Sequence, residues 1–186
     1  MMTSPGRRAF VFSALAALGL LGPRMAAAAP VTYISLGDSL AFGVGENDTA
    51  TDVSNGDRGF VKPFADVLAS FNGGVRPNVI NLGVSGTTSV SFFEGGGGIR
   101  TPQAALRNTH YSNTTTTQNS LLLATIAEER TAGRDIGYVT ISLGSNDLFA
   151  LVLDPAFGRV SDAEKFRLLG QTLQTVAIRI STLLTE

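Results

Sequence analysis

The chain of 186 residues contains 44% hydrophobic and 16% charged side chains, which suits one globular domain that buries a core. Its formal net charge of -1 provides no basic surface field and argues against a nucleic-acid partner. The sequence contains no cysteine, which excludes disulfides, thiolate metal sites and a cysteine nucleophile.

The N-terminal segment has the pattern of an export signal. Arg7 and Arg8 form a basic start, and residues 9–21 form an apolar stretch that is short for a membrane span. Small residues at 26–28 predict cleavage after Ala28. The paired arginines resemble a twin-arginine signal, while Sec export and an uncleaved anchor are the alternatives.

Residues 1–28 are therefore predicted to be a signal peptide, and residues 29–186 a single domain. Cleavage removes three arginines and no acidic residue, which leaves eleven basic and fifteen acidic side chains. We expect an exported protein, periplasmic or extracellular, without a stable membrane span after the signal is removed.

Three nearly continuous apolar runs predict strands that are covered on both faces, as in a parallel sheet. They lie at residues 31–36, 75–82 and 136–143. A short helix is expected at residues 40–43, directly after the first run.

Longer helices are predicted between and after the strands. Pro63 can occupy a first helical turn, and one buried face is expected from apolar residues at spacings of three and four: Phe64, Val67, Leu68 and Phe71. Residues 102–107 predict a short helix, and Ser120 is expected to cap a helix over 121–131. Ser161 and Glu164 have capping-box spacing at the start of a last helix, whose apolar stripe is expected at Phe166, Leu169, Leu173, Val176, Ile180 and Leu183.

The alternation of strands and helices predicts an α/β fold with helices on both faces of a parallel sheet. Three strands are few for this class, in which about five are common, and a three-stranded parallel sheet leaves an edge bare. We therefore expect that the domain lacks its C-terminal part.

Each predicted strand ends in a loop that carries a residue suited to acyl chemistry. In open parallel sheets, ligands bind beyond the carboxyl ends of the strands. Ser39 follows the first strand, Gly83 the second and Asn146 the third. A serine nucleophile requires N–H donors around the carbonyl oxygen that becomes negative, and these three residues can supply them.

These loops resemble three blocks of the GDSL, or SGNH, hydrolase family: Gly37-Asp38-Ser39-Leu40, Asn81-Leu82-Gly83-Val84-Ser85-Gly86 and Gly144-Ser145-Asn146-Asp147. The resemblance implies a flavodoxin-like three-layer α/β/α sandwich and a serine esterase acting on small-molecule, lipid or acylated-sugar esters, with no cofactor and no metal. It implies Ser39 as nucleophile and first oxyanion donor, completed by Gly83 and Asn146. Asp38 and Asp147 would be supporting residues.

The sequence departs from that family at its fourth block, Asp-x-x-His, which occurs nowhere in the chain. The single histidine, His110, falls in a polar stretch between the second and third strands, where a solvent-facing loop residue is the expectation. The sequence thus predicts a nucleophile and an oxyanion hole without their base. The alternative is a non-catalytic ester- or glycan-binding relative, or an inactive fragment.

Overall fold

The computed structural model describes residues 31–44, 58–96, 98–99, 110–111, 113 and 115–185. The predicted signal peptide over 1–28 and the short helix predicted over 102–107 lie outside these ranges. No helix within the described ranges is both long and apolar enough to cross a membrane.

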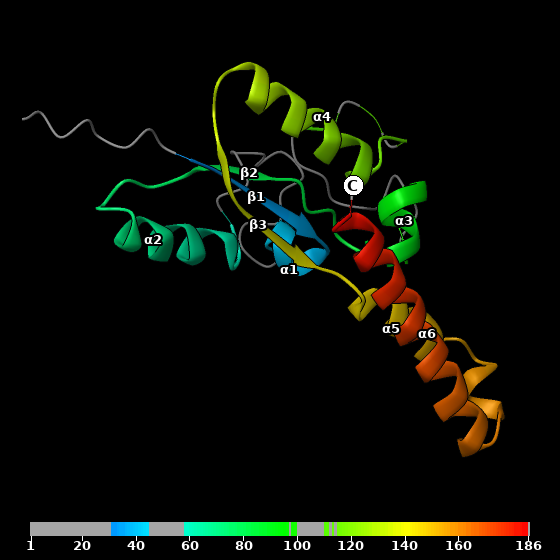
Figure 1. Cartoon of the computed structure of the whole chain (residues 1–186). Coiled ribbons are helices and arrows are strands. Elements are labelled where there is room, and N and C mark those ends of the chain that lie inside the picture. The colour runs from blue at the N-terminus through cyan, green and yellow to red at the C-terminus, as the bar shows by residue number, and fades with distance from the viewer. Residues whose placement is uncertain are drawn as a thin grey trace, which may run out of the picture.

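A three-stranded parallel sheet forms the centre of the molecule (Figure 1). Strand β1 (Thr32–Gly37) lies between β2 (Asn78–Asn81) and β3 (Ile136–Ser142). This confirms the predicted number and direction of the strands. Strand β2 begins later than predicted because Pro77 has no N–H to donate, so the ladder begins with Asn78 N–H donating to Val31 O at 2.9 Å.

Strand β1 is buried along its whole length because helices cover both faces of the sheet. Its side chains alternate between two cores, as the period of a strand requires. Ile34 and Leu36 pack with Leu82, Phe92 and Leu122 on one face. Tyr33 packs on the other face with three residues of α2: Val61, Ala65 and Leu68. Figure 1 shows α4 and α2 on opposite sides of the sheet, which confirms the predicted three-layer arrangement.

Six α-helices accompany the sheet in the described part of the chain. They are α1 (Ser39–Phe42), α2 (Val61–Phe71), α3 (Ser89–Glu94), α4 (Gln118–Thr131), α5 (Ser145–Val152) and α6 (Asp162–Leu183). A single 3₁₀ turn at Phe157–Arg159 lies between α5 and α6. Helices α3 and α5 are not among the predicted elements. Helix α5 begins at Ser145, within the loop that was predicted to follow the third strand.

Two predictions about individual helices are wrong. In α2, Val67 and Phe71 are 49% and 82% exposed, because the face toward the sheet runs through Val61, Ala65 and Leu68 instead. Helix α4 begins three residues earlier than predicted. Its cap is Thr117, whose hydroxyl accepts from the N–H of Ser120 at 3.0 Å.

Helix α6 is capped as predicted, since the Ser161 hydroxyl accepts from Glu164 N–H at 3.3 Å. The helix packs against α5 and α3, and Figure 1 shows the α5–α6 pair extending away from the sheet. Its predicted apolar stripe is divided: Val176 is buried, whereas Phe166 and Leu173 are exposed. In the described part of the chain, no element packs over the face of α6 that carries Phe166 and Leu173.

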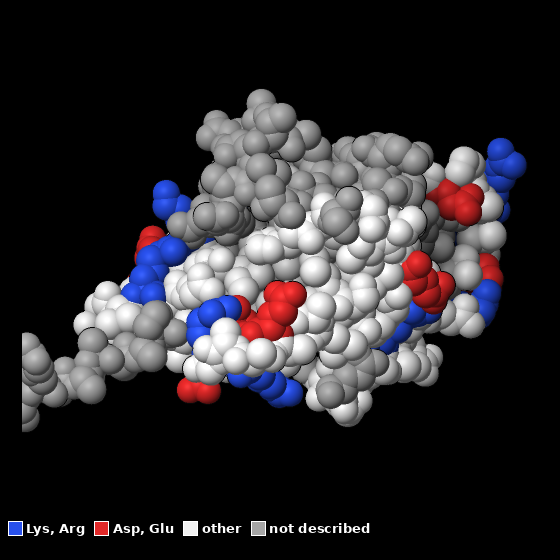
Figure 2. Space-filling model, turned by 90° about the horizontal axis from the view of Figure 1, so that it is seen from above, with Lys and Arg blue, Asp and Glu red and all other residues white. Residues whose placement is uncertain are grey.

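Charged side chains of both signs share the surface. On the face seen in Figure 2, Lys and Arg lie in small groups beside Asp and Glu rather than in one basic field. This distribution agrees with the small net charge of the sequence.

A buried carboxylate joins α4 to the start of the sheet. Glu129 is 4% exposed and accepts from the Thr32 hydroxyl at 2.5 Å. It also forms an ion pair with Arg134, whose Nε and Nη2 donate at 2.7 and 2.5 Å. The hydrogen bonds from Arg134 hold the pKa of Glu129 below its usual value, assisted by Thr32 and opposed by desolvation.

We expect Glu129→Gln to lower the free energy of unfolding at pH 7 by about 1–2 kcal/mol, because one charge-assisted contact to a buried group is lost. A carboxylate with a lowered pKa stabilises the fold above its unfolded pKa, and this contribution disappears as the pH falls through the folded pKa. Urea denaturation of wild type and variant should therefore converge in acid.

The matched control is Glu164→Gln, which alters a Glu–Arg pair on the exposed face of α6 with Arg167. We expect its urea midpoint to equal that of the wild type at both pH values, because exposed pairs contribute little. Equal midpoints for Glu129→Gln and wild type at pH 7 would contradict the role given to Glu129.

Candidate active site

Ser39 is the first residue of α1, directly beyond the carboxyl end of β1. The chain turns there through Gly37 at φ 131°, where a Cβ would lie 2.1 Å from the carbonyl oxygen of Ser142. Asp38 caps the helix by accepting from Leu40 N–H at 3.0 Å. Ser39 itself is half-buried, and neither its hydroxyl nor its N–H has a hydrogen-bond partner in the described part of the chain. Both groups are available to a ligand.

Asp38 joins the Ser39 turn to the end of β3. Its carboxyl group is buried and accepts from the hydroxyl of Ser145 at 2.5 Å and from that of Ser142 at 3.3 Å. The Asp38 N–H also donates to Ser142 O at 3.0 Å. Asp38 therefore has the contacts of a residue that positions the turn carrying Ser39.

Gln118, at the first turn of α4, joins the Ser39 turn to the loop after β2. Its side-chain carbonyl accepts from Gly37 N–H at 2.9 Å, and its amide donates to Gly37 O at 2.7 Å. The same amide nitrogen donates to the Thr87 hydroxyl at 2.8 Å. Nothing local in the sequence singles out Gln118, because its partners lie 31 and 81 residues away along the chain.

Asn146 lies in the first turn of α5 and is 5% exposed. Its carboxamide donates to Thr87 O at 2.9 Å, which uses one of the two hydrogens on that nitrogen. These contacts form a closed circuit. Asp38 accepts from Ser145, and the next residue, Asn146, donates to Thr87. Gln118 then links Thr87 to Gly37, the residue before Asp38. The structure thereby joins all three predicted loops at one edge of the sheet.

Gly83 lies in the second of these loops, but its N–H is already used. It donates to the side-chain carbonyl of Asn81 at 2.9 Å, and the Asn81 amide donates to Ala41 O at 2.6 Å. A Cβ on Gly83 would lie 2.7 Å from Phe42 N, so a glycine permits the close approach of this loop to α1. In the structure, Gly83 serves packing.

Gly86 ends the same loop and was not among the predicted site residues. It has φ 86° and immediately precedes Thr87, whose carbonyl oxygen holds Asn146. Among the described residues, no partner exists for the Gly86 N–H. The signal that could have identified it is its place at the end of the same Gly83–Gly86 motif.

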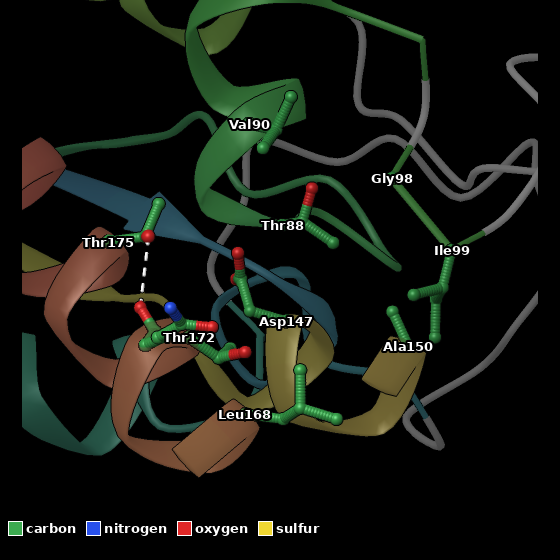
Figure 3. A pocket seen from close by; sticks show the side chains of 10 residues that line it. Thr88, Val90, Gly98, Ile99, Asp147, Ala150, Leu168, Thr172 and Thr175 are labelled. Atoms are coloured by element: carbon green, nitrogen blue, oxygen red, sulfur yellow. Dashed lines mark hydrogen bonds between the residues drawn. The ribbon is translucent and has the colours of Figure 1, made fainter. Parts of the chain in front are cut away.

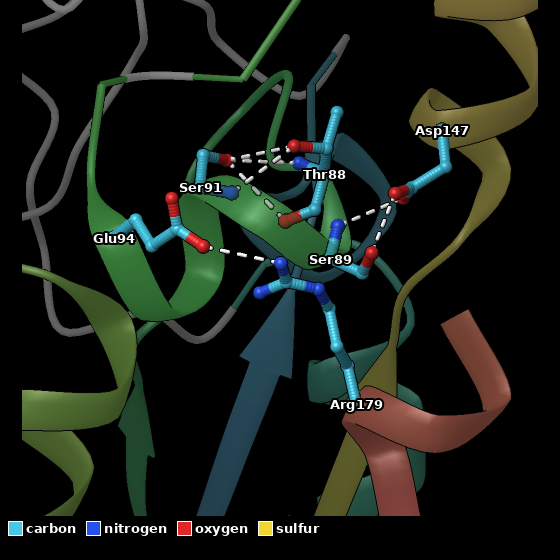
Figure 4. Close-up of polar contacts among 6 residues, drawn as sticks. All are labelled: Thr88, Ser89, Ser91, Glu94, Asp147 and Arg179. Atoms are coloured by element: carbon cyan, nitrogen blue, oxygen red, sulfur yellow. Dashed lines mark hydrogen bonds and ion pairs between the residues drawn. The ribbon is translucent and has the colours of Figure 1, made fainter. Parts of the chain in front are cut away.

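Asp147 fastens α5 to α3. Its carboxylate accepts from the N–H and hydroxyl of Ser89 at 2.8 and 2.6 Å, as Figure 4 shows. The α3 N-terminus is further fixed by reciprocal contacts between Thr88 and Ser91. These contacts set the position of the helix turn that carries Asn146.

The structure does not bring His110 to Ser39. His110 is exposed and borders a cavity of about 380 Å³ together with Asn78 and Glu128. Asn78 pairs with Thr32 at the start of β1, while Ser39 lies beyond its end, and six strand residues span about 16 Å. Desolvation lowers the pKa of His110, opposed in part by the carboxylate of Glu128.

The model of the family described as GDSL-like Lipase/Acylhydrolase matches residues 33–183. The chain belongs to the GDSL-like lipase/acylhydrolase family. No curated protein and no solved structure gives a significant match. Family membership supports ester hydrolysis as the type of reaction, and it agrees with the three-layer α/β fold.

The circuit of contacts predicts that Gln118→Leu destabilises the protein by about 2–3 kcal/mol, because the buried N–H of Gly37 loses its partner. The free energy of unfolding from urea titration measures this change. Gln174→Leu, at an exposed position of α6, is the control and should stay within about 0.5 kcal/mol of wild type. Equal losses in both variants would show that Gln118 does not hold the loops together.

Proposed function

We propose that this protein is an exported serine ester hydrolase in which Ser39 is the nucleophile. One observation carries the proposal: the hydrogen-bonded circuit places an unpaired serine hydroxyl and the Asn146 carboxamide on loops that are fastened to each other. Family membership supports the ester-hydrolysing reaction type.

In the proposed reaction, the Ser39 hydroxyl oxygen attacks the ester carbonyl carbon and its proton passes to a base. The carbonyl oxygen becomes negative and accepts from the Ser39 N–H and from the second hydrogen of the Asn146 amide. Gly86 N–H is the third donor that the contacts favour, because Gly83 N–H reaches the oxyanion only after leaving Asn81. Collapse expels the alcohol, and water then hydrolyses the acyl-serine.

In the described part of the chain, no titratable side chain forms a hydrogen bond with the Ser39 hydroxyl and so stands as its base. His110 is the single histidine of the sequence, and it borders the other half of the sheet. Asp38 is buried and engaged with two hydroxyls. We therefore propose a site that holds nucleophile and oxyanion donors and takes its proton acceptor from outside these residues. Removing the base from a serine triad leaves only a small residual rate.

A second candidate function follows from the same observation about His110. A protein with the fastened loops but no base can bind an ester or glycan without turning it over. This reading predicts saturable binding of an ester together with a hydrolysis rate that does not depend on Ser39. The experiment below separates the two functions.

We expect hydrolysis of p-nitrophenyl acetate by the chain to be slow and to rise with added imidazole, because imidazole can enter as the missing base. The Ser39→Ala variant should lose the part of this increase that exceeds hydrolysis by imidazole alone. The measurement is the initial rate at several imidazole concentrations, with protein-free samples subtracted.

Val44→Ala, an exposed position just after α1, is the control and should keep the wild-type response to imidazole. Identical rates for wild type and Ser39→Ala at every imidazole concentration would contradict the proposed nucleophile and favour the binding protein. Rapid Ser39-dependent turnover without imidazole would contradict the proposal that the base is missing.

The proposed export depends on residues 1–28, where Arg7 and Arg8 distinguish between the two pathways. If the signal is of the twin-arginine type, replacing both arginines by lysine should abolish export, while a Sec signal should retain it. Immunoblots of periplasmic and cytoplasmic fractions measure the outcome. Retention of the unprocessed wild-type chain in the cytoplasm would contradict export by either pathway.

A further inference from the structure

Helix α1 is a single turn, so its position depends on contacts with other parts of the chain. A helix of four residues is not stable in water by itself. Its start is capped by Asp38, and its middle is held by Asn81, whose side-chain amide donates to Ala41 O at 2.6 Å. These contacts leave the last residue of the turn, Phe42, to be fixed by a different segment.

The side chain of Arg58 packs on that last residue. Arg58 lies three residues before the start of α2 and is 8% exposed. Its guanidinium carbon is 5.0 Å from the centre of the Phe42 ring, and Phe42 is itself 5% exposed. An aromatic face attracts a cation within about 6 Å, and the attraction is stronger when the pair is removed from water. The contact therefore joins the end of α1 to the segment that precedes α2.

Two glycines allow the two segments to come this close. A Cβ on Gly43 would lie 2.6 Å from the Cβ of Arg58, and a Cβ on Gly59 would lie 2.8 Å from the Cα of Gly43. The N–H groups of Gly43 and Val44 donate to Ser39 O at 2.9 and 3.0 Å. Whatever fixes the end of α1 therefore also fixes Ser39.

We propose that Arg58 is a positioning residue for the nucleophile and that it holds Ser39 in place through Phe42. The inference rests on the proposed function for the role of Ser39. Arginine suits this task because its planar guanidinium stacks on aromatic rings and is more weakly hydrated than an ammonium group. The site loops fasten the start of α1, and Arg58 fastens its end.

Two other roles for Arg58 predict different results. An arginine that only fills space can be replaced by methionine, which is unbranched, flexible and uncharged. An arginine that binds the substrate directly changes KM when it is removed. A positioning residue instead changes kcat at constant KM, because the substrate still binds while the attacking oxygen of Ser39 is misplaced.

Amide hydrogen exchange measured by NMR tests the position of α1 without catalysis. We expect Arg58→Met to speed exchange at the N–H groups of Gly43 and Val44 about tenfold, which is within the range of a buried cation–π contact. Arg58→Lys should have a smaller effect, because an ammonium group keeps part of the attraction. Unchanged exchange at both N–H groups in Arg58→Met would overturn the inference.

Arg179→Met is the matched control, because it removes an arginine whose partner lies outside α1. Arg179 of α6 contacts Glu94 of α3 at 3.1 Å, as Figure 4 shows. Helices α3 and α6 border a cavity of about 480 Å³ (Figure 3), and none of the residues that border it belongs to α1. We expect Arg179→Met to leave exchange at Gly43 and Val44 unchanged. An increase as large as that in Arg58→Met would overturn the inference.

A double-mutant cycle tests whether the effect passes through the aromatic ring. Phe42→Leu keeps an apolar side chain and removes the ring, and we expect it to speed exchange at Gly43 and Val44 by a similar factor. Adding Arg58→Met to Phe42→Leu should then have little further effect, because the contact is already lost. Two effects that multiply at full size would overturn the inference.

The imidazole assay keeps the inference separate from the proposed function. For Ser39-dependent hydrolysis of p-nitrophenyl acetate, we expect Arg58→Met to lower kcat about tenfold at unchanged KM, and Arg58→Lys to recover part of the loss. A wild-type kcat in Arg58→Met, or a change confined to KM, would overturn the positioning role and keep the hydrolase. Faster exchange in Arg58→Met without Ser39-dependent turnover in any of the proteins would overturn the hydrolase and keep the contact.

Discussion

The close approach of Gly37 to the end of β3 is the constraint on which the rest of the site depends. A side chain at this position would collide with Ser142 O, and the φ of 131° disfavours any residue with a Cβ. Because Gly37 fits, Asp38 N–H reaches Ser142 O and the Asp38 carboxyl reaches Ser145. The same contacts therefore fix the positions of the turn that carries Ser39 and the turn that carries Asn146 relative to each other.

The central strand explains why this constraint holds. All six residues of β1 are buried, so the turn after it begins from a rigid base. Its neighbours fix its register on both sides, with Leu36 paired to Ile141 at the site end. A serine placed at the end of such a strand has little freedom, which is what a preorganised acyl-transfer site needs.

The sequence allowed the sheet and the three site loops to be predicted, because strand burial and glycine turns are local properties. The continuous apolar run of β1 indicated a strand covered on both faces, and the structure has it so. Contacts between distant segments were not predictable. In the sequence, Gln118 resembles any polar residue near the start of a helix. Only folding brings Gly37 to its side-chain carbonyl and Thr87 to its side-chain amide nitrogen.

The errors have the same origin. Phe71 fits an apolar spacing with Phe64, yet the position of α2 on the sheet decides which side is covered, and Phe71 is left 82% exposed. Helix α3 is only six residues long and rests on contacts between Thr88 and Ser91, a serine in place of the usual acidic or amide partner. The role of Gly83 as an oxyanion donor, by contrast, stays a prediction; in the structure its N–H donates to the side-chain carbonyl of Asn81.

Helix α6 differs from the rest of the site in how it is held. The Ser89 contacts of Asp147 and the Asn146 contact to Thr87 fix α5 and α3 through buried groups. Helix α6 instead has its own cap and exposed ion pairs within the helix. It adds one surface pair from Arg179 to Glu94 and a single buried side chain, Val176. Regions with few buried apolar contacts open most easily. Helix α6 is therefore the most deformable of these three helices, whereas α3 and α5 are held by buried contacts.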